Sequence, residues 1–428
     1  MTDVLHILES AQSLLEDGHV HEAVAGFRRV YELLPAEISV TTLLANALRV
    51  SGDTPGERAV WIEAAARLSG DSGAIDYQIG TGLLTTGAPF ESIPLLERVA
   101  KARPADSAAV GALASAYRAT GRLELAWAQV QRALKISPRS ATLLFTAAQI
   151  RHSQGSLTEA LRLLDKVVRI RPDHPPTRLQ RGLTYLLAGN LAAGWADFEF
   201  RGLPTCETSA KAWCGESLVG GSIAVIAEQG LGDLFHFIRF VPLLHTAGAS
   251  RVVVQAPEGT LRLLRQSGFE AVTKDALPAT DWFVPLLSLP YRLGITNPSD
   301  LGETPYLSTG SAPQRPRSSG RPRVGLAWKG NPAFLATSLR DLDAETLDAI
   351  LQIRTVDWVS LQYGVELPGS CESKAPLGPT TDWLDTARAI EQLDAVVSVD
   401  TSIAHLAGAI GRPVFILLPF TPDWRWGL

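Results

Sequence analysis

One stretch in the first half of the chain decides the fold of that half: Leu-Ala-Ser-Ala-Tyr-Arg-Ala-Thr-Gly-Arg-Leu-Glu-Leu-Ala-Trp-Ala-Gln-Val-Gln-Arg-Ala-Leu-Lys-Ile-Ser-Pro (residues 113–138). Both parts of the stretch carry apolar and small residues at the spacing of one helix face. These are Leu113, Ala114 and Tyr117 before Gly121, and Ala126, Val130 and Ala133 before Pro138. Glycine follows the first periodic segment and proline follows the second, so the stretch predicts a pair of helices joined by a tight turn.

The same unit recurs through the first half of the chain. The turn glycine repeats in steps of 34 or 35 residues, at Gly18, Gly52, Gly87, Gly121, Gly155 and Gly189. Gly80 and Gly182 lie seven residues before a turn, where we expect two helices to approach closely. A fixed period of this length is typical of stacked helix pairs that bury their apolar faces on one another.

This period and these residue types resemble the tetratricopeptide repeat. The resemblance covers six units and implies an α-solenoid over residues 1–202. The concave face of such a solenoid usually binds a peptide or a partner protein. Two interpretations stay open: the solenoid recruits an acceptor or partner, or it only positions the next domain or mediates self-association. The aromatic-rich end of the last unit, residues 194–201, is expected to form a capping helix packed on the next domain.

After Gly202 the pattern changes to short apolar runs that alternate with helices. Expected strands lie at 222–227, 251–255, 281–284, 324–328, 357–361, 395–399 and 414–418, and expected helices at 233–246, 260–267, 344–351, 383–392 and from 400–402 to 408. This alternation predicts parallel sheets with crossover helices. A stretch rich in proline, serine and arginine at 311–322 reads as a linker. The predicted organisation is α plus α/β, with Rossmann-like halves at 203–310 and 323–428 that together describe the GT-B architecture.

Composition narrows the function classes. The formal net charge is 39 − 44 = −5, so no basic surplus exists for nucleic-acid binding. No segment reads as a signal peptide or as a membrane span. The three cysteines show no CxxC spacing, which indicates no zinc or disulfide framework and suits a reducing compartment. A cytoplasmic location is therefore expected.

The strongest local motif is Val-Val-Ser-Val-Asp-Thr-Ser-Ile-Ala-His-Leu-Ala-Gly-Ala-Ile-Gly-Arg-Pro-Val (residues 396–414). It predicts a buried strand that turns sharply into a helix. The backbone amides of Thr401, Ser402 and Ile403 would then be unpaired and favourable for a diphosphate. Asp400 at the strand end could accept hydrogen bonds from sugar hydroxyls, and His405 lies one turn into the helix. Asp400 and Thr401 could equally form an ordinary helix cap, and His405 could be a core histidine.

This motif resembles the donor-binding signature of the bacterial heptosyltransferases, the glycosyltransferase family 9 type, and of tetratricopeptide proteins related to them. Further matches follow in the family's order at 228–233, 324–332, 360–362, 385–387 and 422–426. The resemblance implies inverting sugar transfer from a nucleotide sugar, without a metal or other cofactor. The O-GlcNAc transferases share the plan of helical repeats before a GT-B region.

The motif Glu-Gln-Gly-Leu-Gly-Asp (residues 228–233) places a glycine-rich loop, Gly230 and Gly232, before a helix. Phe235 stands where a dinucleotide fingerprint has its third glycine, which disfavours a nicotinamide site and an oxidoreductase. The resemblance implies that Asp233 is the general base for the acceptor hydroxyl. A structural alternative stays open, in which Asp233 only caps the helix that follows.

Other site residues follow from the same resemblance. Arg340, with Lys329 as a second candidate, is expected to bind the leaving diphosphate, because a guanidinium pairs with phosphate oxygens without a metal. Asp233 and His405 are the candidate catalytic residues. The expected partners are a nucleotide-sugar donor and a protein or glycan acceptor, which the concave face of the solenoid could hold.

The chain departs from the family at several positions. Phe334 and residues 336–338 replace a polar stretch, His236 stands where glutamine is usual, and the chain stops at Leu428. The C-terminal half is therefore expected to be abbreviated. These departures keep a second function open: a protein-interaction scaffold whose transferase region is inactive.

Overall fold

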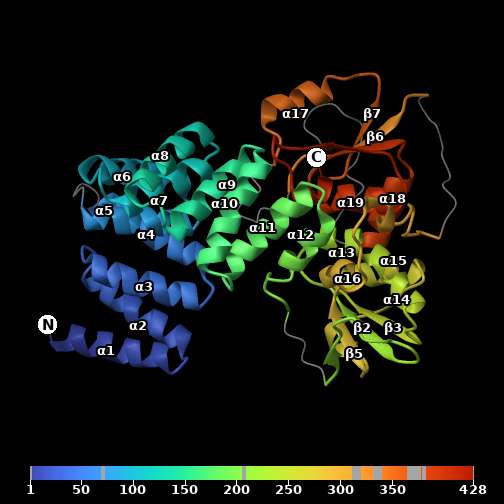
Figure 1. Ribbon diagram of the computed structural model, residues 1–428, viewed down its shortest axis with the longest axis horizontal. Coiled ribbons are helices and arrows are strands. Elements are labelled where there is room, and N and C mark those ends of the chain that lie inside the picture. Colours follow the sequence, from blue (N-terminus) through green and yellow to red (C-terminus); the bar gives the residue numbers. More distant parts are fainter. Residues whose placement is uncertain are drawn as a thin grey trace. The chain divides into compact units, whose positions relative to one another are not determined.

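The computed structural model describes residues 2–68, 73–204, 209–310, 320–330, 340–363, 377 and 382–427 (Figure 1). The chain divides into two compact units, Met1–Thr177 and Arg178–Leu428. No helix in the described ranges is long and apolar enough to cross a membrane.

The first unit is a stack of helices in which each one packs on the next along the chain. They are α1 (Thr2–Glu16), α2 (Val20–Leu33), α3 (Ile38–Val50), α4 (Thr54–Leu68), α5 (Ala74–Thr85), α6 (Pro89–Ala102), α7 (Ser107–Ala119), α8 (Leu123–Ile136), α9 (Ala141–Ser153) and α10 (Leu157–Ile170). Apolar faces such as Leu113, Ala114 and Val130 are buried between neighbouring pairs. The predicted helical solenoid is confirmed.

The turn glycines explain the period. All six adopt positive φ, from 72° at Gly155 to 85° at Gly18, a conformation that costs glycine nothing. Gly80 and Gly182 are needed for a different reason. A Cβ at Gly80 would lie 2.9 Å from Leu96, and one at Gly182 would lie 2.8 Å from the backbone nitrogen of Phe198. The predicted close approaches are therefore present.

The second unit begins within the sixth helix pair, α11 (Pro175–Leu187) and α12 (Leu191–Phe198). α12 ends three residues before the predicted capping segment does. Its Trp195 and Phe198 enter the apolar core of this unit, together with Leu186 of α11 and Phe237. The predicted boundary at residue 202 and the linker at 311–322, of which 311–319 lie outside the described residues, stay predictions.

The first α/β part is a parallel sheet with the strand order β1-β5-β2-β3-β4. Its strands are β1 (Lys211–Ala212), β2 (Ser222–Ile226), β3 (Arg251–Gln255), β4 (Glu270–Val272) and β5 (Trp282–Pro285). Its helices are α13 (Leu231–Phe237), η1 (Ile238–Phe240), α14 (Pro242–Thr246), η2 (Glu258–Thr260), α15 (Leu261–Gln266), η3 (Lys274–Ala276), η4 (Leu286–Ser288), α16 (Leu289–Arg292) and η5 (Pro298–Leu301). Sequence patterns missed β1 and β4, which are too short for periodicity to be visible.

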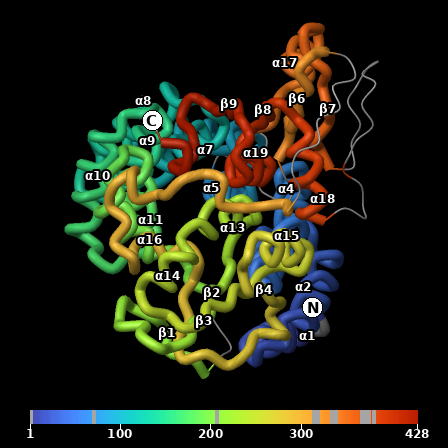
Figure 2. Tube along the Cα trace, turned by 90° about the vertical axis from the view of Figure 1, so that its right-hand side faces the viewer, coloured from blue at the N-terminus to red at the C-terminus, as the bar shows by residue number. Residues whose placement is uncertain are grey.

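The second α/β part is a parallel sheet with the order β7-β6-β8-β9 (Figure 2). Its strands are β6 (Arg323–Ala327), β7 (Asp357–Ser360), β8 (Ala395–Val399) and β9 (Val414–Leu417), and its helices are α17 (Ala344–Leu351), α18 (Trp383–Glu391), α19 (Ser402–Ala409) and η7 (Trp424–Trp426). The α plus α/β class is thus confirmed, with two parallel sheets.

The prediction of one continuous helix at 233–246 is wrong. It is broken into α13, η1 and α14 because Pro242 cannot donate a backbone hydrogen bond and its ring clashes with the preceding turn. Just before the proline, the Val241 amide donates a hydrogen bond of 3.1 Å to the carbonyl oxygen of Ile238, three residues earlier. The break leaves α13 as a short helix that begins at the glycine-rich loop.

Candidate functional site

The candidate base Asp233 lies in the first turn of α13, directly after the loop that leaves β2. Its Oδ2 accepts the amide hydrogen of Gly230 at 3.1 Å, so the predicted capping contact exists. Its Oδ1 accepts from Nε of Arg425 at 2.8 Å and also from Nη2 of Arg425. Both side chains are only 12% exposed. Asp233 therefore caps its helix and is held by an arginine 192 residues away.

Arg425 is itself fixed by the segment around it. Nη1 donates to Oδ1 of Asp423 at 2.8 Å, and the guanidinium lies 4.3 Å from the ring centre of Trp424. Burial alone would lower the pKa of Arg425, but the Asp233 and Asp423 carboxylates outweigh burial and raise this pKa. The arginine is a permanent cation beside the candidate base.

The loop before α13 is held by a buried ion pair that the sequence did not reveal. Arg201 donates to both carboxylate oxygens of Glu228, at 3.1 and 2.6 Å, and the two side chains are 3% and 5% exposed. Glu228 also accepts the amide hydrogen of Leu287 at 3.1 Å. Gln229 follows with φ at 58°, in the left-handed region. Glu228 was part of a recognised motif, but nothing in the sequence connected it with Arg201.

The helix α19 begins at Ser402, and its N-cap residue Thr401 follows Asp400 at the carboxyl end of β8. Among the described residues, the N-cap residue Thr401 makes no capping hydrogen bond with its side chain, and its Oγ1 lies 3.0 Å from Oγ of Ser398 instead. Ser402 and Ile403 form the first turn. Nη1 of Arg340 lies 3.3 Å from Oδ2 of Asp400, so two predicted site residues, 60 apart in sequence, pair with each other.

Lys329 lies at the same sheet edge, because β6 and β8 are parallel neighbours and Ala327 pairs with Ser398. The turn is pinned by Gln362 Oε1, which accepts the amide hydrogens of Trp328 at 3.3 Å and Lys329 at 3.1 Å. The side chain of Lys329 is exposed. Phe334 and residues 336–338, where the chain departs from the resembled family, lie outside the described residues.

His405 faces α13 from the first turns of α19. Its Nδ1 lies 3.4 Å from Nδ1 of His236, so one imidazole donates and the other accepts. Burial, followed by the charge of Arg425, lowers the pKa of His405 to about 3. Burial and the nearby His405 lower the pKa of His236 well below its usual 6.5. Both rings are neutral at pH 7, which removes the imidazolium as a phosphate-binding cation.

Two contacts fix the orientation of His405. Trp426 stacks on its ring, with centroids 4.5 Å apart and an interplanar angle of 17°. A Cβ at Gly232 would lie 2.8 Å from Cδ2 of His405, so Gly232 allows α13 and α19 to pack together. Gly230 instead provides the amide that Asp233 caps. The two glycines of the loop therefore serve helix packing and helix capping.

The structure thus gathers the predicted residues into two adjacent groups. Asp233, Gly230, Gly232 and His405 lie where α13 packs on α19. Asp400, Thr401, Ser402, Ile403, Arg340 and Lys329 surround the start of α19 and the nearby sheet edge. No group of His, Cys, Asp or Glu in the described part of the chain could hold a metal ion. Arg425 had no role assigned from the sequence, although it lies in the segment 422–426 (Pro-Asp-Trp-Arg-Trp) that matches the resembled family.

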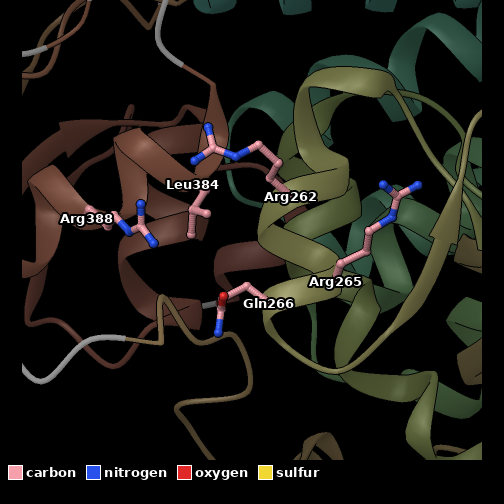
Figure 3. Close-up of a pocket in the computed structure, with 5 residues that line it drawn as sticks. All are labelled: Arg262, Arg265, Gln266, Leu384 and Arg388. Carbon is pink, nitrogen blue, oxygen red and sulfur yellow. The ribbon is translucent and has the colours of Figure 1, made fainter.

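A pocket lies elsewhere in this unit, between α15 and α18 (Figure 3). It is lined by Arg262, Arg265, Gln266, Leu384 and Arg388. Arg262 already pairs with Asp382 at 2.8 Å and Asp385 at 3.3 Å, so carboxylates of the protein compensate part of the positive charge.

Comparisons with known proteins agree with both resemblances. The tetratricopeptide repeat family model matches residues 77–141 and 128–175. The model of glycosyltransferase family 9 (heptosyltransferase) matches residues 365–427. Protein FlbA of Caulobacter vibrioides is 23% identical over 464 residues, which cover 88% of this chain and 76% of FlbA.

Solved tetratricopeptide structures resemble the helical part. One is a tetratricopeptide repeat protein of Parabacteroides merdae, 15% identical, with a TM-score of 0.40, covering 48% of this chain and 82% of its own. Another is YrrB, described as a TPR protein with an unusual peptide-binding site, 22% identical, with a TM-score of 0.32, covering 40% of this chain and 88% of its own. The two family-model matches show that the chain combines tetratricopeptide repeats with a segment of glycosyltransferase family 9 type.

Proposed function

We propose that this chain transfers a sugar from a nucleotide-sugar donor to an acceptor recruited by its repeats, with inversion and without a metal. The observation that carries the proposal is the packing of α13 on α19. In it a carboxylate, Asp233, lies near the start of α19, where the side chain of the N-cap residue Thr401 makes no capping hydrogen bond in the described part of the chain. A GT-B arrangement of the two parallel sheets, acting in the cytoplasm, belongs to the same proposal.

The reaction is a single displacement at the anomeric carbon. The acceptor oxygen attacks this carbon, its proton passes to Asp233, and the bond to the diphosphate oxygen breaks. The amides of the first α19 turn and the guanidinium of Arg340 would stabilise the charge that develops on the leaving diphosphate. Arg340 must then exchange its contact with Asp400 for phosphate oxygens, which frees Asp400 to accept sugar hydroxyls.

His405 enters as a neutral ring. Because its pKa is lowered to about 3, it can donate or accept one hydrogen bond but supplies no charge at pH 7. Its stacking on Trp426 and its contact with His236 suit a role in orienting groups beside the reaction centre.

Thermal unfolding with UDP-, GDP-, ADP- and CMP-sugars in the presence of EDTA tests the donor site. A ligand at about 100 times its Kd should stabilise the folded chain by about 2.7 kcal/mol. We expect one nucleotide class to raise the Tm. Arg340→Ala should remove most of the shift, whereas Arg354→Ala, an exposed arginine in the turn before β7, should keep it. No shift with any nucleotide sugar would refute the donor site.

Turnover tests the base. Asp233→Asn should keep the donor-induced Tm shift and lose sugar transfer, because an amide cannot accept the acceptor proton. Full turnover in this variant would refute the assignment of Asp233.

A scaffold with an inactive transferase region is the second candidate. It is favoured by the pairing of the key groups within the chain: Asp233 with Arg425, and Arg340 with Asp400. This candidate predicts neither a Tm shift with any nucleotide sugar nor release of free nucleotide, while a partner still binds the repeats.

A further inference from the structure

The segment Asp423–Trp426 lies against the candidate base, and the proposed reaction uses only its Trp426, which stacks on His405. Trp424 anchors this segment in an aromatic cluster. Its ring centre lies 5.4 Å from that of Trp195, 5.3 Å from that of Phe198 and 6.1 Å from that of Phe237. Arg425, the next residue, therefore projects from a fixed base of packed rings.

The two carboxylate oxygens of Asp233 accept hydrogen bonds from different partners. Each carboxylate oxygen has two lone-pair sites. Nε and Nη2 of Arg425 both donate to Oδ1, while Oδ2 accepts one hydrogen, from the Gly230 amide. The remaining acceptor capacity of the carboxylate therefore lies on Oδ2.

From this geometry we infer that Arg425 is a positioning residue for sugar transfer: it fixes the Asp233 carboxylate so that Oδ2 receives the acceptor proton. The inference rests on the proposed function, and it assigns a task to the Trp-Arg-Trp motif. Asp423 helps to position Asp233 indirectly, by holding Arg425. Its Oδ1 accepts hydrogen bonds from Nη1 of Arg425 at 2.8 Å and from the Arg425 amide at 3.0 Å.

A lysine cannot reproduce this arrangement. The guanidinium directs two donors, Nε and Nη2, at Oδ1 of Asp233 and a third, Nη1, at Asp423, whereas an ammonium on a flexible stem acts as a point charge. Arg425→Lys keeps the charge but lets the carboxylate rotate. Misplacement of a catalytic group by about 1 Å can cost about 100-fold in rate.

The test measures release of free nucleotide by the full chain, with water as acceptor, from whichever sugar of the UDP, GDP, ADP and CMP panel raises the Tm. We expect Arg425→Lys to lower kcat between about 10- and 100-fold and to leave the donor KM within about twofold. Asp423→Asn should lower kcat less, because Arg425 keeps its contacts with Asp233. The pH profile of kcat should also change in Arg425→Lys, since the group that takes the proton has lost its fixed partner.

Arg251→Lys is the matched control. Arg251 also donates through Nε and Nη2 to one carboxylate, that of Glu270, but this pair is about half exposed and joins β3 to β4. We expect wild-type kcat in this variant.

The outcomes separate the two proposals. Wild-type kcat and an unchanged pH profile in folded Arg425→Lys would overturn the positioning role and leave the proposed function standing, provided that Asp233→Asn is inactive. A lower Tm with unchanged kcat per folded molecule would mark Arg425 as structural and overturn the inference equally. Full turnover in Asp233→Asn, or no nucleotide release by the wild-type chain, would refute the proposed function and with it this inference.

Discussion

The contacts that stabilise each unit internally span very different distances along the sequence in the two units. In the repeats, Tyr117 donates to Glu97, 20 residues away, and Gln78 donates to Thr42, 36 residues away. In the second unit, His236 meets His405 across 169 residues and Asp233 meets Arg425 across 192. Because its contacts join neighbouring repeats, one repeat of a solenoid can unfold locally while the others stay folded. Contacts between residues far apart in the sequence form only when the whole second unit folds.

The largest expected effect lies in the second unit. Glu228→Gln leaves the guanidinium of Arg201 buried with fewer acceptors, and breaking a buried pair costs about 3–5 kcal/mol. We expect the lower end of this range, because Arg201 keeps its contact with Glu199 at 2.8 Å. Chemical denaturation followed by tryptophan fluorescence reports this unit, since eight of the ten tryptophans lie in it.

Glu270→Gln is the control for that prediction. Its partner Arg251 is exposed, so the loss should stay below about 1 kcal/mol. Equal losses in the two variants would contradict the distinction between the buried and the exposed pair.

The second expected effect is a loss of folding stability at acidic pH. The pKa of His405 falls from its usual 6.5 to about 3, so between these values the unfolded chain binds a proton that the folded chain does not. Stability should therefore fall as the pH drops below 6.5, by roughly 1 kcal/mol for each pH unit, toward pH 3. Unfolding free energies measured from pH 7 to pH 4 should show a smaller slope in His405→Gln. An unchanged slope would contradict this origin of the acid sensitivity.

The smallest expected effect is local and lies in the repeats. Gly121 has φ at 74°, so Gly121→Ala should cost about 1–2 kcal/mol, although no atom would obstruct the new Cβ. Hydrogen exchange should speed up in α7 and α8 and stay unchanged in α1 and α2. Gly408→Ala serves as the control, because this helical glycine also has open space and no positive φ, and the change should stabilise α19 by about 0.5–1 kcal/mol. Faster exchange throughout the first unit would show that its repeats do not open separately.

The same contrast explains what the sequence could predict. The helix pairs follow from a period, because each turn glycine answers a local backbone requirement, and β3, α17 and β8 match their expected bounds. The contacts of the candidate site, in contrast, could not be predicted from local sequence patterns. Gly232 is required by His405, and the partners of Asp233 and Glu228 lie far away in the chain, so no periodicity records them. The strand–turn–helix pattern supplied Asp400 and family resemblance supplied Asp233 and Arg340, but the pairing of Arg340 with Asp400 became visible only in three dimensions.

The loop that precedes Asp233 keeps a residue in an unfavourable conformation. Gln229 is the non-glycine residue with positive φ in the described part of the chain, and such a residue gives up roughly 1–2 kcal/mol relative to glycine there. Its side chain, which a glycine would lack, carries an amide whose Oε1 lies 3.5 Å from Nη2 of Arg425. The left-handed loop residue and the arginine that holds the Asp233 carboxylate are thus in direct contact, so a change of loop conformation at Gln229 would reach the candidate base through one intervening residue.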